Sequence, residues 1–126
     1  MSRNAGRCRL LWRVLSVGFA FGCLESFAPA GAKEFTPPDI YRTWWAEVEA
    51  CAQLSGDFSR VEWYEVPGSR YDCSAYPTGC AGSWHPPHTI YVAQAWENDP
   101  RVVKHEMLHD LLQRGDHPPV FRTCDV

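Results

Sequence analysis

The most constraining feature of the sequence is a pair of histidines, His105 and His109, that bracket Glu106 in a His-Glu-x-x-His pattern. In an α-helix, residues four apart lie on the same face, so both imidazoles can bind one metal ion. Glu106 lies about 100° around the helix from His105. Glu106 is therefore better suited to act as a base on a metal-bound water than to be a third ligand on the same helix face as the two histidines.

The residues around this motif carry the signals of a helix over residues 100–114. Asp99 before Pro100 is typical of an N-cap followed by proline at the first helical position. Gly115 is the residue that best accepts the left-handed conformation that ends a helix. Apolar residues occur on both sides of the histidine face, which predicts a buried helix.

A third ligand is expected just beyond this helix. Catalytic zinc usually takes three protein ligands and leaves the fourth position to water. We expect His117 to be the third ligand, because the chain can turn after Gly115 and bring it back to the metal. Asp116 is the alternative, either as the ligand itself or as a hydrogen-bond partner of a ligand imidazole.

The first 32 residues have the pattern of a secretory signal peptide. Four arginines precede the apolar run 14–24, and Ala30-Gly31-Ala32 is typical of a cleavage site. The apolar run is too short for a membrane span, which needs about 20 residues. Cys23 leaves lipidation as an alternative, although Phe21 fits a lipoprotein motif poorly. We therefore expect a single domain over residues 33–126 in a secreted or periplasmic protein.

Composition of the predicted mature chain limits its partners. Residues 33–126 contain eight Lys/Arg and fourteen Asp/Glu, a formal charge of 8 minus 14, or −6, with histidine neutral. No basic stripe is present, which argues against nucleic acid as a partner. The four remaining cysteines indicate two disulfides in an exported chain of this size. We favour Cys73–Cys80 and Cys51–Cys124, and a cysteine zinc site is disfavoured because there is no C-x-x-C pair.

The periodicity of the remaining residues predicts an α+β fold. Apolar residues at three- and four-residue steps indicate a helix from about residue 36 to residue 56, whose tryptophans are expected in the core. Residues 58–66 and 89–93 are expected to be strands, separated by an irregular, disulfide-closed loop over 69–87. His85 and His88 lie in or beside that loop, where solvated side chains are the expectation. The result is an N-terminal helix, a short antiparallel sheet and an active-site helix held by disulfides.

The segment His105-Glu106-Met107-Leu108-His109 resembles the active-site helix of the zincin metallopeptidases. The resemblance covers residues 90–117 and implies zinc ligands at His105 and His109 and a general base at Glu106. It also implies that residues 90–93 form the edge strand that aligns an extended peptide. Leu112 and Gly115 depart from the metzincin pattern, and no glutamate follows Glu106 as gluzincins require. The subfamily therefore stays unassigned.

The sequence supports three functional hypotheses. The first is a secreted, monomeric zinc metallopeptidase that hydrolyses a peptide or protein substrate, with a zinc site at His105, His109 and His117. The second is a non-catalytic binding module whose zinc is closed by a fourth protein ligand. The third is a metal-free, disulfide-held binding domain. Three residues are candidates to stabilise an oxyanion in the first case: Tyr64, Tyr71 and Tyr91.

Overall fold

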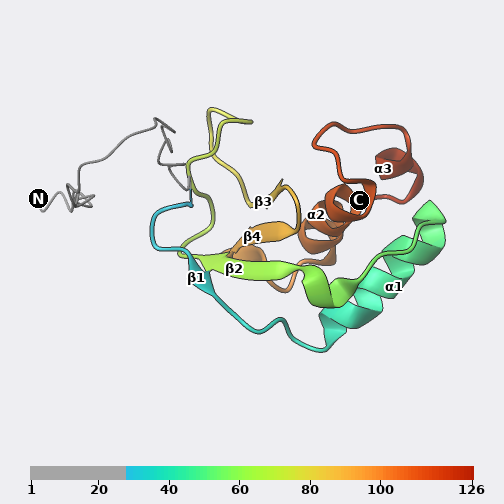
Figure 1. Cartoon of the computed structure of the whole chain (residues 1–126). Helices are drawn as coiled ribbons and strands as arrows, with labels where there is room; N and C mark the ends of the chain where they lie inside the picture. Colours follow the sequence, from blue (N-terminus) through green and yellow to red (C-terminus); the bar gives the residue numbers. More distant parts are fainter. Residues whose placement is uncertain (1–27) are drawn as a thin grey trace, which may run out of the picture.

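The computed structural model describes residues 28–126 (Figure 1). Most of the predicted signal peptide, including Cys23, lies outside the described residues. Within residues 28–126, no helix combines the length and the apolar character needed to cross a membrane.

Four strands form one mixed sheet in the order β1-β2-β4-β3. They are β1 (Lys33–Glu34), β2 (Glu62–Val66), β3 (Gly82–His85) and β4 (Thr89–Ala93). The β1–β2 and β3–β4 pairs are antiparallel, but β2 and β4 are parallel. The wholly antiparallel sheet is therefore wrong. After β2 a long connection leads to β3, which forms the edge of the sheet. The chain then turns back and places β4 between β3 and β2, where it runs parallel to β2.

The edge of the sheet beside the histidine helix is β3, and not the strand that follows it. The prediction that residues 90–93 form the edge strand is wrong, because β4 is hydrogen-bonded to β2 on one side and to β3 on the other. Ile90, Tyr91, Val92 and Ala93 are all buried. Such a continuous apolar run is typical of a strand covered on both faces.

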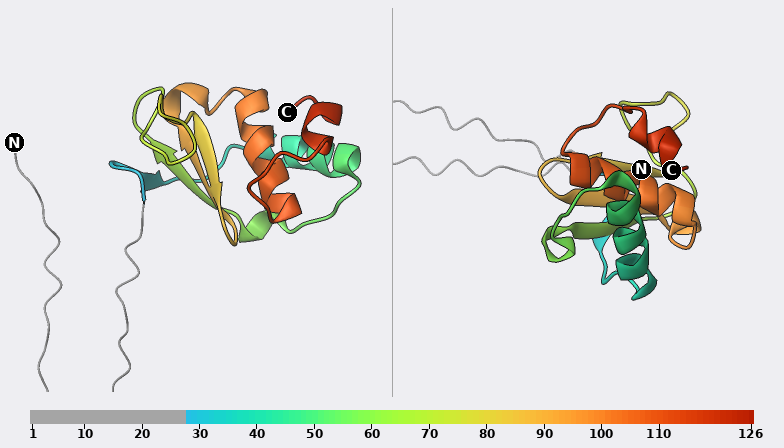
Figure 2. Two further views of the ribbon diagram at one scale, coloured as in Figure 1. Left: turned by 90° about the horizontal axis from the view of Figure 1, so that it is seen from above. Right: turned by 90° about the vertical axis from the view of Figure 1, so that its right-hand side faces the viewer.

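The helices gather on one face of the sheet (Figure 2). They are α1 (Ile40–Ala52), α2 (Pro100–Leu112) and the short α3 (Val120–Thr123). The core between them and the sheet is rich in aromatic side chains; the Tyr41 and Trp63 rings, for example, lie 4.9 Å apart between centroids. The buried residues of this core are Tyr41, Trp45, Val48, Val61, Trp63, Ile90, Val92, Val103, Met107, Leu108 and Phe121. The α+β class is thus confirmed.

The ends of α2 show which local signals determine the helix. At its start Asp99 accepts a hydrogen bond from the backbone N–H of Arg101 at 2.9 Å, and Pro100 opens the first turn, as predicted. At its end the left-handed residue is Gln113 (φ 53°) and not Gly115. The Gln113 side chain donates to the carbonyl oxygens of Pro87 and Asp110, both at 2.7 Å. These bonds offset the cost of a left-handed conformation in a residue with a Cβ.

Two further segments differ from the sequence prediction. Residues 58–60 form a 3₁₀ turn (η1, Phe58–Arg60) instead of the start of a strand. The reason is local, because the Asp57 carboxylate accepts from the backbone N–H of Ser59 at 3.0 Å and bends the chain. The segment 69–87, predicted to be an irregular loop, contains β3. This strand forms through its pairing with β4, and the glycines and prolines around it give no local signal of a strand.

Both predicted disulfides are present. Cys51–Cys124 joins the end of α1 to the C-terminal segment across 73 positions of the sequence. Cys73–Cys80 closes a local loop whose base is an antiparallel bridge between Tyr71 and Cys80. Two disulfides in so small a domain fit an oxidising, extracytoplasmic setting.

The local loop generates a first prediction at Gly79. This residue has φ 87°, and a Cβ there would lie 2.9 Å from the Tyr71 carbonyl oxygen. Gly79→Ala should therefore lower the free energy of unfolding by about 2–5 kcal/mol, from left-handed strain plus the backbone contact. Gly68→Ala is the matched control, since it has φ 88° with open space around it and should lose only about 1–2 kcal/mol. Equal losses in denaturant titrations of the two variants would contradict this account.

Candidate metal centre

Three imidazole rings converge between α2 and α3. The Nε2 atom of His105 lies 3.2 Å from Nε2 of His109 and 3.0 Å from Nε2 of His117. Each ring offers one ligand atom, and the three atoms lie within 4.8 Å of one another. The structure therefore brings together all three histidines that the sequence singles out, two from one face of α2 and one from the turn that follows.

A backbone acceptor fixes the orientation of one of these rings. His109 Nδ1 lies 2.8 Å from the carbonyl oxygen of Arg114. A carbonyl oxygen only accepts, so the ring nitrogen that faces it must carry the proton. The neutral ring then has its lone pair on Nε2, the atom that points to the centre of the cluster. The same arrangement orients the histidine ligands of known metal sites.

The spacing of the nitrogens suits a small divalent ion. Zinc binds imidazole nitrogen at about 2.0–2.1 Å in tetrahedral geometry, which separates two ligand nitrogens by about 3.3 Å. The two short separations in the cluster are close to that value. In the absence of an ion, the same distances are those of N–H···N hydrogen bonds between neutral rings, in which the tautomers decide the donor. The donor set thus fits a metal ion such as zinc, held by three histidines.

Burial favours the neutral form of the His105 and His109 rings. The pKa of His105 is lowered to about 4, mainly by desolvation and in part by the neighbouring His109 and His117 rings. The pKa of His109 is also lowered by burial, against the effect of its bond to Arg114. Neutral imidazole is the form that binds metal.

Phe121 of α3 supports the cluster from behind, a role that the sequence does not reveal. Its ring centroid lies 4.9, 4.6 and 4.9 Å from those of His105, His109 and His117. Phe121 is buried, and Cys124, in the disulfide with Cys51, follows it by three residues. The covalent bond therefore holds the apolar wall of the site against α2.

Asp116, the alternative third ligand, is engaged elsewhere. Its carboxylate accepts two hydrogen bonds from the Arg114 guanidinium, at 2.5 and 2.6 Å. Those bonds lower the pKa of Asp116 below its ordinary value. Within residues 28–126 the groups that could share one ion are the three histidines alone.

Glu106 is buried against the edge strand. Only 6% of the residue is exposed, and burial raises the pKa of its carboxyl to about 8, with the backbone N–H of Trp84 acting in the opposite direction. A Cβ at Gly82 would lie 3.0 Å from both Cγ and Oε1 of Glu106. The carboxylate can approach the sheet this closely because β3 has no side chain at that position.

A buried polar network holds the β3–β4 hairpin to α2. Asp110 is 4% exposed and accepts from Trp84 Nε1 at 2.9 Å, and its carboxylate lies 3.1 Å from Nδ1 of His88. The expectation that His88 is a solvated side chain is therefore wrong. Trp84 in turn stacks on the ring of His109, with 16° between the planes and 6.3 Å between centroids. The sequence signal for this network is a charged residue, Asp110, on a helix predicted to be buried.

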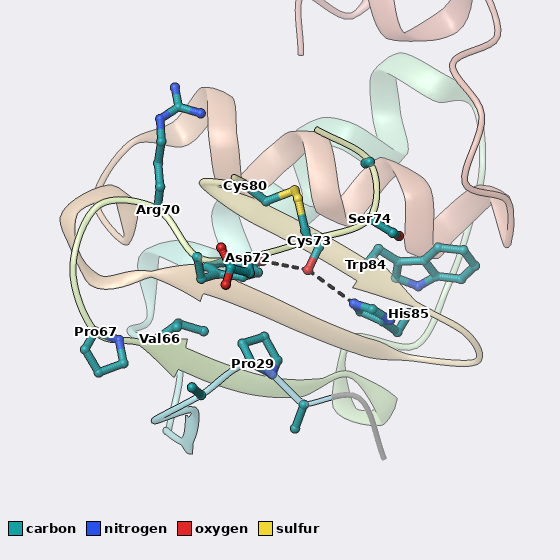
Figure 3. Close-up of a pocket in the computed structure, with 15 residues that line it drawn as sticks. Pro29, Val66, Pro67, Arg70, Asp72, Cys73, Ser74, Cys80, Trp84 and His85 are labelled. Atoms are coloured by element: carbon teal, nitrogen blue, oxygen red, sulfur yellow. Dashed lines mark hydrogen bonds between the residues drawn. A yellow bond between two sulfur atoms is a disulfide. The ribbon is translucent and has the colours of Figure 1, made fainter. Parts of the chain in front are cut away.

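The three candidate tyrosines lie on the other face of the sheet. Figure 3 shows a pocket there of about 1040 Å³, in which the Tyr71 hydroxyl lies 2.6 Å from Ser83 Oγ. Ser83 Oγ lies 3.3 Å from His85, which is exposed as expected. Tyr64 and Tyr91 pack together on the same face, with ring centroids 5.2 Å apart. None of these tyrosines lines the groove beside the histidine cluster.

That groove lies between α2, the edge strand and the disulfide loop. It encloses about 520 Å³, within the size range of ligand-binding clefts. His105 and Glu106 both line it, and Gly82 forms part of its wall. Tyr76, 55% exposed at the tip of the disulfide loop, stands at its margin. A bound molecule in this groove would lie beside both the metal ligand and the buried carboxylate.

A comparison with known proteins identified no relative of the chain. No family model, curated protein or solved structure matches it. The resemblance to zincins consequently remains a prediction from the motif.

The cluster predicts different effects for the two residues that compete as third ligand. His117→Ala removes a nitrogen at the centre and should weaken zinc binding by more than about 100-fold, since loss of a mere neighbour of a ligand costs about 10- to 100-fold. Asp116→Asn breaks only the pair with Arg114 and should change zinc affinity less than about threefold. Competition with a chromophoric chelator measures both constants. The reverse order would make Asp116 the ligand.

The disulfide that anchors α3 generates a second prediction for the site. Replacing both Cys51 and Cys124 by alanine frees the segment that carries Phe121 and the backbone of Val126. Zinc affinity should fall by about 10- to 100-fold, the range for changes to the surroundings of a ligand. The Cys73→Ala/Cys80→Ala protein is the matched control, because that disulfide does not contact the histidines. Equal zinc affinity in the two double variants would contradict a role for the C-terminal disulfide.

Proposed function

We propose that the protein is an extracytoplasmic, zinc-dependent metallopeptidase. The observation that carries the proposal is the convergence of three Nε2 atoms, one of them on His105, which lines a groove together with Glu106. Three protein ligands are the number that a catalytic zinc takes, which leaves one position open to the substrate side.

The chain supplies the remaining parts of a hydrolytic mechanism. Zinc bound by the histidines would polarise a scissile carbonyl and lower the pKa of water. In its ionised form, which the charge of a neighbouring zinc ion would favour against the effect of burial, Glu106 would accept a proton from the attacking water and deliver it to the leaving amine. Its burial between α2 and Gly82 limits its movement, which favours a fixed geometry for proton transfer.

The edge strand β3 supports a peptide as the substrate. Antiparallel pairing with β4 uses the backbone groups of Ser83 and His85, so those of Gly82 and Trp84 point away from the sheet. The Trp84 N–H is directed to Glu106, and the backbone of Gly82 lines the groove. An extended peptide can therefore pair with Gly82 and lie across the site. In this proposal β3 takes the role that the sequence assigned to residues 90–93.

The alternative of a structural zinc site is less well supported. A structural site would be closed by a fourth protein ligand. Asp116, the alternative ligand, could close it only by breaking its hydrogen bonds to Arg114. A buried carboxylate next to a metal ligand also serves no purpose in a purely structural site. The metal-free hypothesis would leave N–H···N hydrogen bonds alone to hold the three converging imidazoles together.

Replacement of Glu106 by glutamine tests the proposal. Glu106→Gln preserves the shape and the zinc ligands but removes the base, so we expect an unchanged zinc content and a loss of peptide cleavage of about 10²- to 10⁴-fold. Zinc is measured by atomic absorption and cleavage with a fluorogenic peptide library. Glu34→Gln, at an exposed carboxylate on β1 outside the groove, is the control and should retain full activity.

Two outcomes would overturn the proposal. If the zinc-loaded protein cleaves no peptide in the library, the structural-zinc hypothesis takes its place. If Glu106→Gln cleaves as fast as the unmodified protein, the buried carboxylate is not the base.

A further inference from the structure

We propose that Arg70 recognises a carboxylate of the bound peptide, so that the groove selects acidic peptides. This inference rests on the proposed function, because it assigns a substrate preference to the same groove.

Arg70 is positioned by the disulfide loop. The neighbouring Tyr71 is bridged to Cys80, and one Arg70 guanidinium nitrogen donates to the carbonyl oxygen of Gly79 at 3.1 Å. In Figure 3 the Arg70 side chain extends away from His85 and from the floor of the pocket on the sheet. Arg70 lines the groove in which His105 and Glu106 lie. A guanidinium carries five donors, so most remain for a ligand after the bond to Gly79.

The charges in the groove favour an anionic ligand at Arg70. Its charged lining consists of Arg70, Asp99, Arg101 and Glu106. Asp99 and Arg101 form an ion pair at 3.2 Å, and Glu106 is buried. Arg70 forms no ion pair within the described part of the chain, so its guanidinium is not neutralised by direct contact with a carboxylate. A guanidinium can bind a carboxylate through two parallel hydrogen bonds, which makes it a selective partner.

The positive charge of Arg70 contrasts with the negative charge of the rest of the domain. Residues 33–126 have a formal charge of −6, so an acidic peptide is repelled by most of the surface. A groove that takes such a peptide therefore needs a local cation, and Arg70 supplies one beside the disulfide loop. The Arg70 side chain is exposed, so we expect it to raise the affinity for an acidic peptide only moderately, by about 5- to 10-fold. This value lies between the effect of a solvent-exposed ion pair and the effect of a buried hydrogen bond to a charged group.

A binding assay tests the preference independently of cleavage. The zinc-loaded Glu106→Gln protein is titrated with fluorescent peptides of one sequence, capped at both ends, that carry Glu or Gln at each position in turn. A third set has a neutral sequence with a free C-terminus, which distinguishes a terminal carboxylate from a side chain. We expect one acidic arm to bind about 5- to 10-fold more tightly than its neutral counterpart.

Substitutions at Arg70 assign the preference to this residue. Arg70→Gln should abolish the difference between acidic and neutral peptides and leave zinc content and neutral-peptide affinity unchanged. Arg70→Lys keeps the positive charge but loses the paired guanidinium donors, so it should retain part of the preference for acidic peptides. Arg122→Gln on α3, outside the groove, is the matched control and should keep the full preference. Equal affinities for acidic and neutral peptides, or a preference that survives Arg70→Gln, would overturn the proposal.

The same peptides separate this inference from the proposed function. If the unmodified protein cleaves peptides without any acidic preference, the inference fails and the peptidase stands. If it cleaves none but still binds acidic peptides through Arg70, the groove is a carboxylate-recognising binding site and the peptidase fails.

Discussion

The site depends on the convergence of three imidazole rings between α2 and α3. Nε2 of His105 lies 3.2 Å from Nε2 of His109 and 3.0 Å from Nε2 of His117. Because His109 Nδ1 faces the carbonyl oxygen of Arg114, the lone pair of that ring is on Nε2 and is directed to the centre. Burial lowers the pKa of both His105 and His109, which favours the neutral, metal-binding form of these rings. The three donors together would suit one divalent cation.

The C-terminal segment that packs against these rings depends on a covalent bond. A short chain buries a limited core, and four of its last residues form only one turn of helix. That turn contributes little apolar area of its own, since Phe121 is its one buried side chain. The Cys51–Cys124 disulfide keeps it in place, and with it the Phe121 ring that packs against the three imidazoles. A metal ion held by the histidines would act on the same segment, because His117 lies just before α3.

Local sequence signals predicted the parts of the structure that neighbours in the sequence determine. The i, i+4 spacing of His105 and His109, the Asp99-Pro100 start of α2 and the strand over 89–93 belong to this class. The features that were missed depend on contacts distant in the sequence. Gln113 ends α2 because Pro87 accepts from its side chain, and β3 exists because β4 is there to pair with it. The residues close to Gln113 and to β3 in the sequence give no indication of these distant partners, Pro87 and β4.

The position of β3 also explains why the chemistry gathers at one edge of the sheet. Side chains alternate along a strand, so Gly82 and Trp84 face α2 while Ser83 and His85 face the opposite pocket. Trp84 fixes the hairpin to Asp110, and Gly82 leaves the room that Glu106 fills. A larger residue at Gly82 would push the carboxylate away from the sheet, and a strand ending at Ser83 would lose the Trp84 contacts. The site is therefore built as much by a missing side chain on the edge strand as by the histidines on the helix.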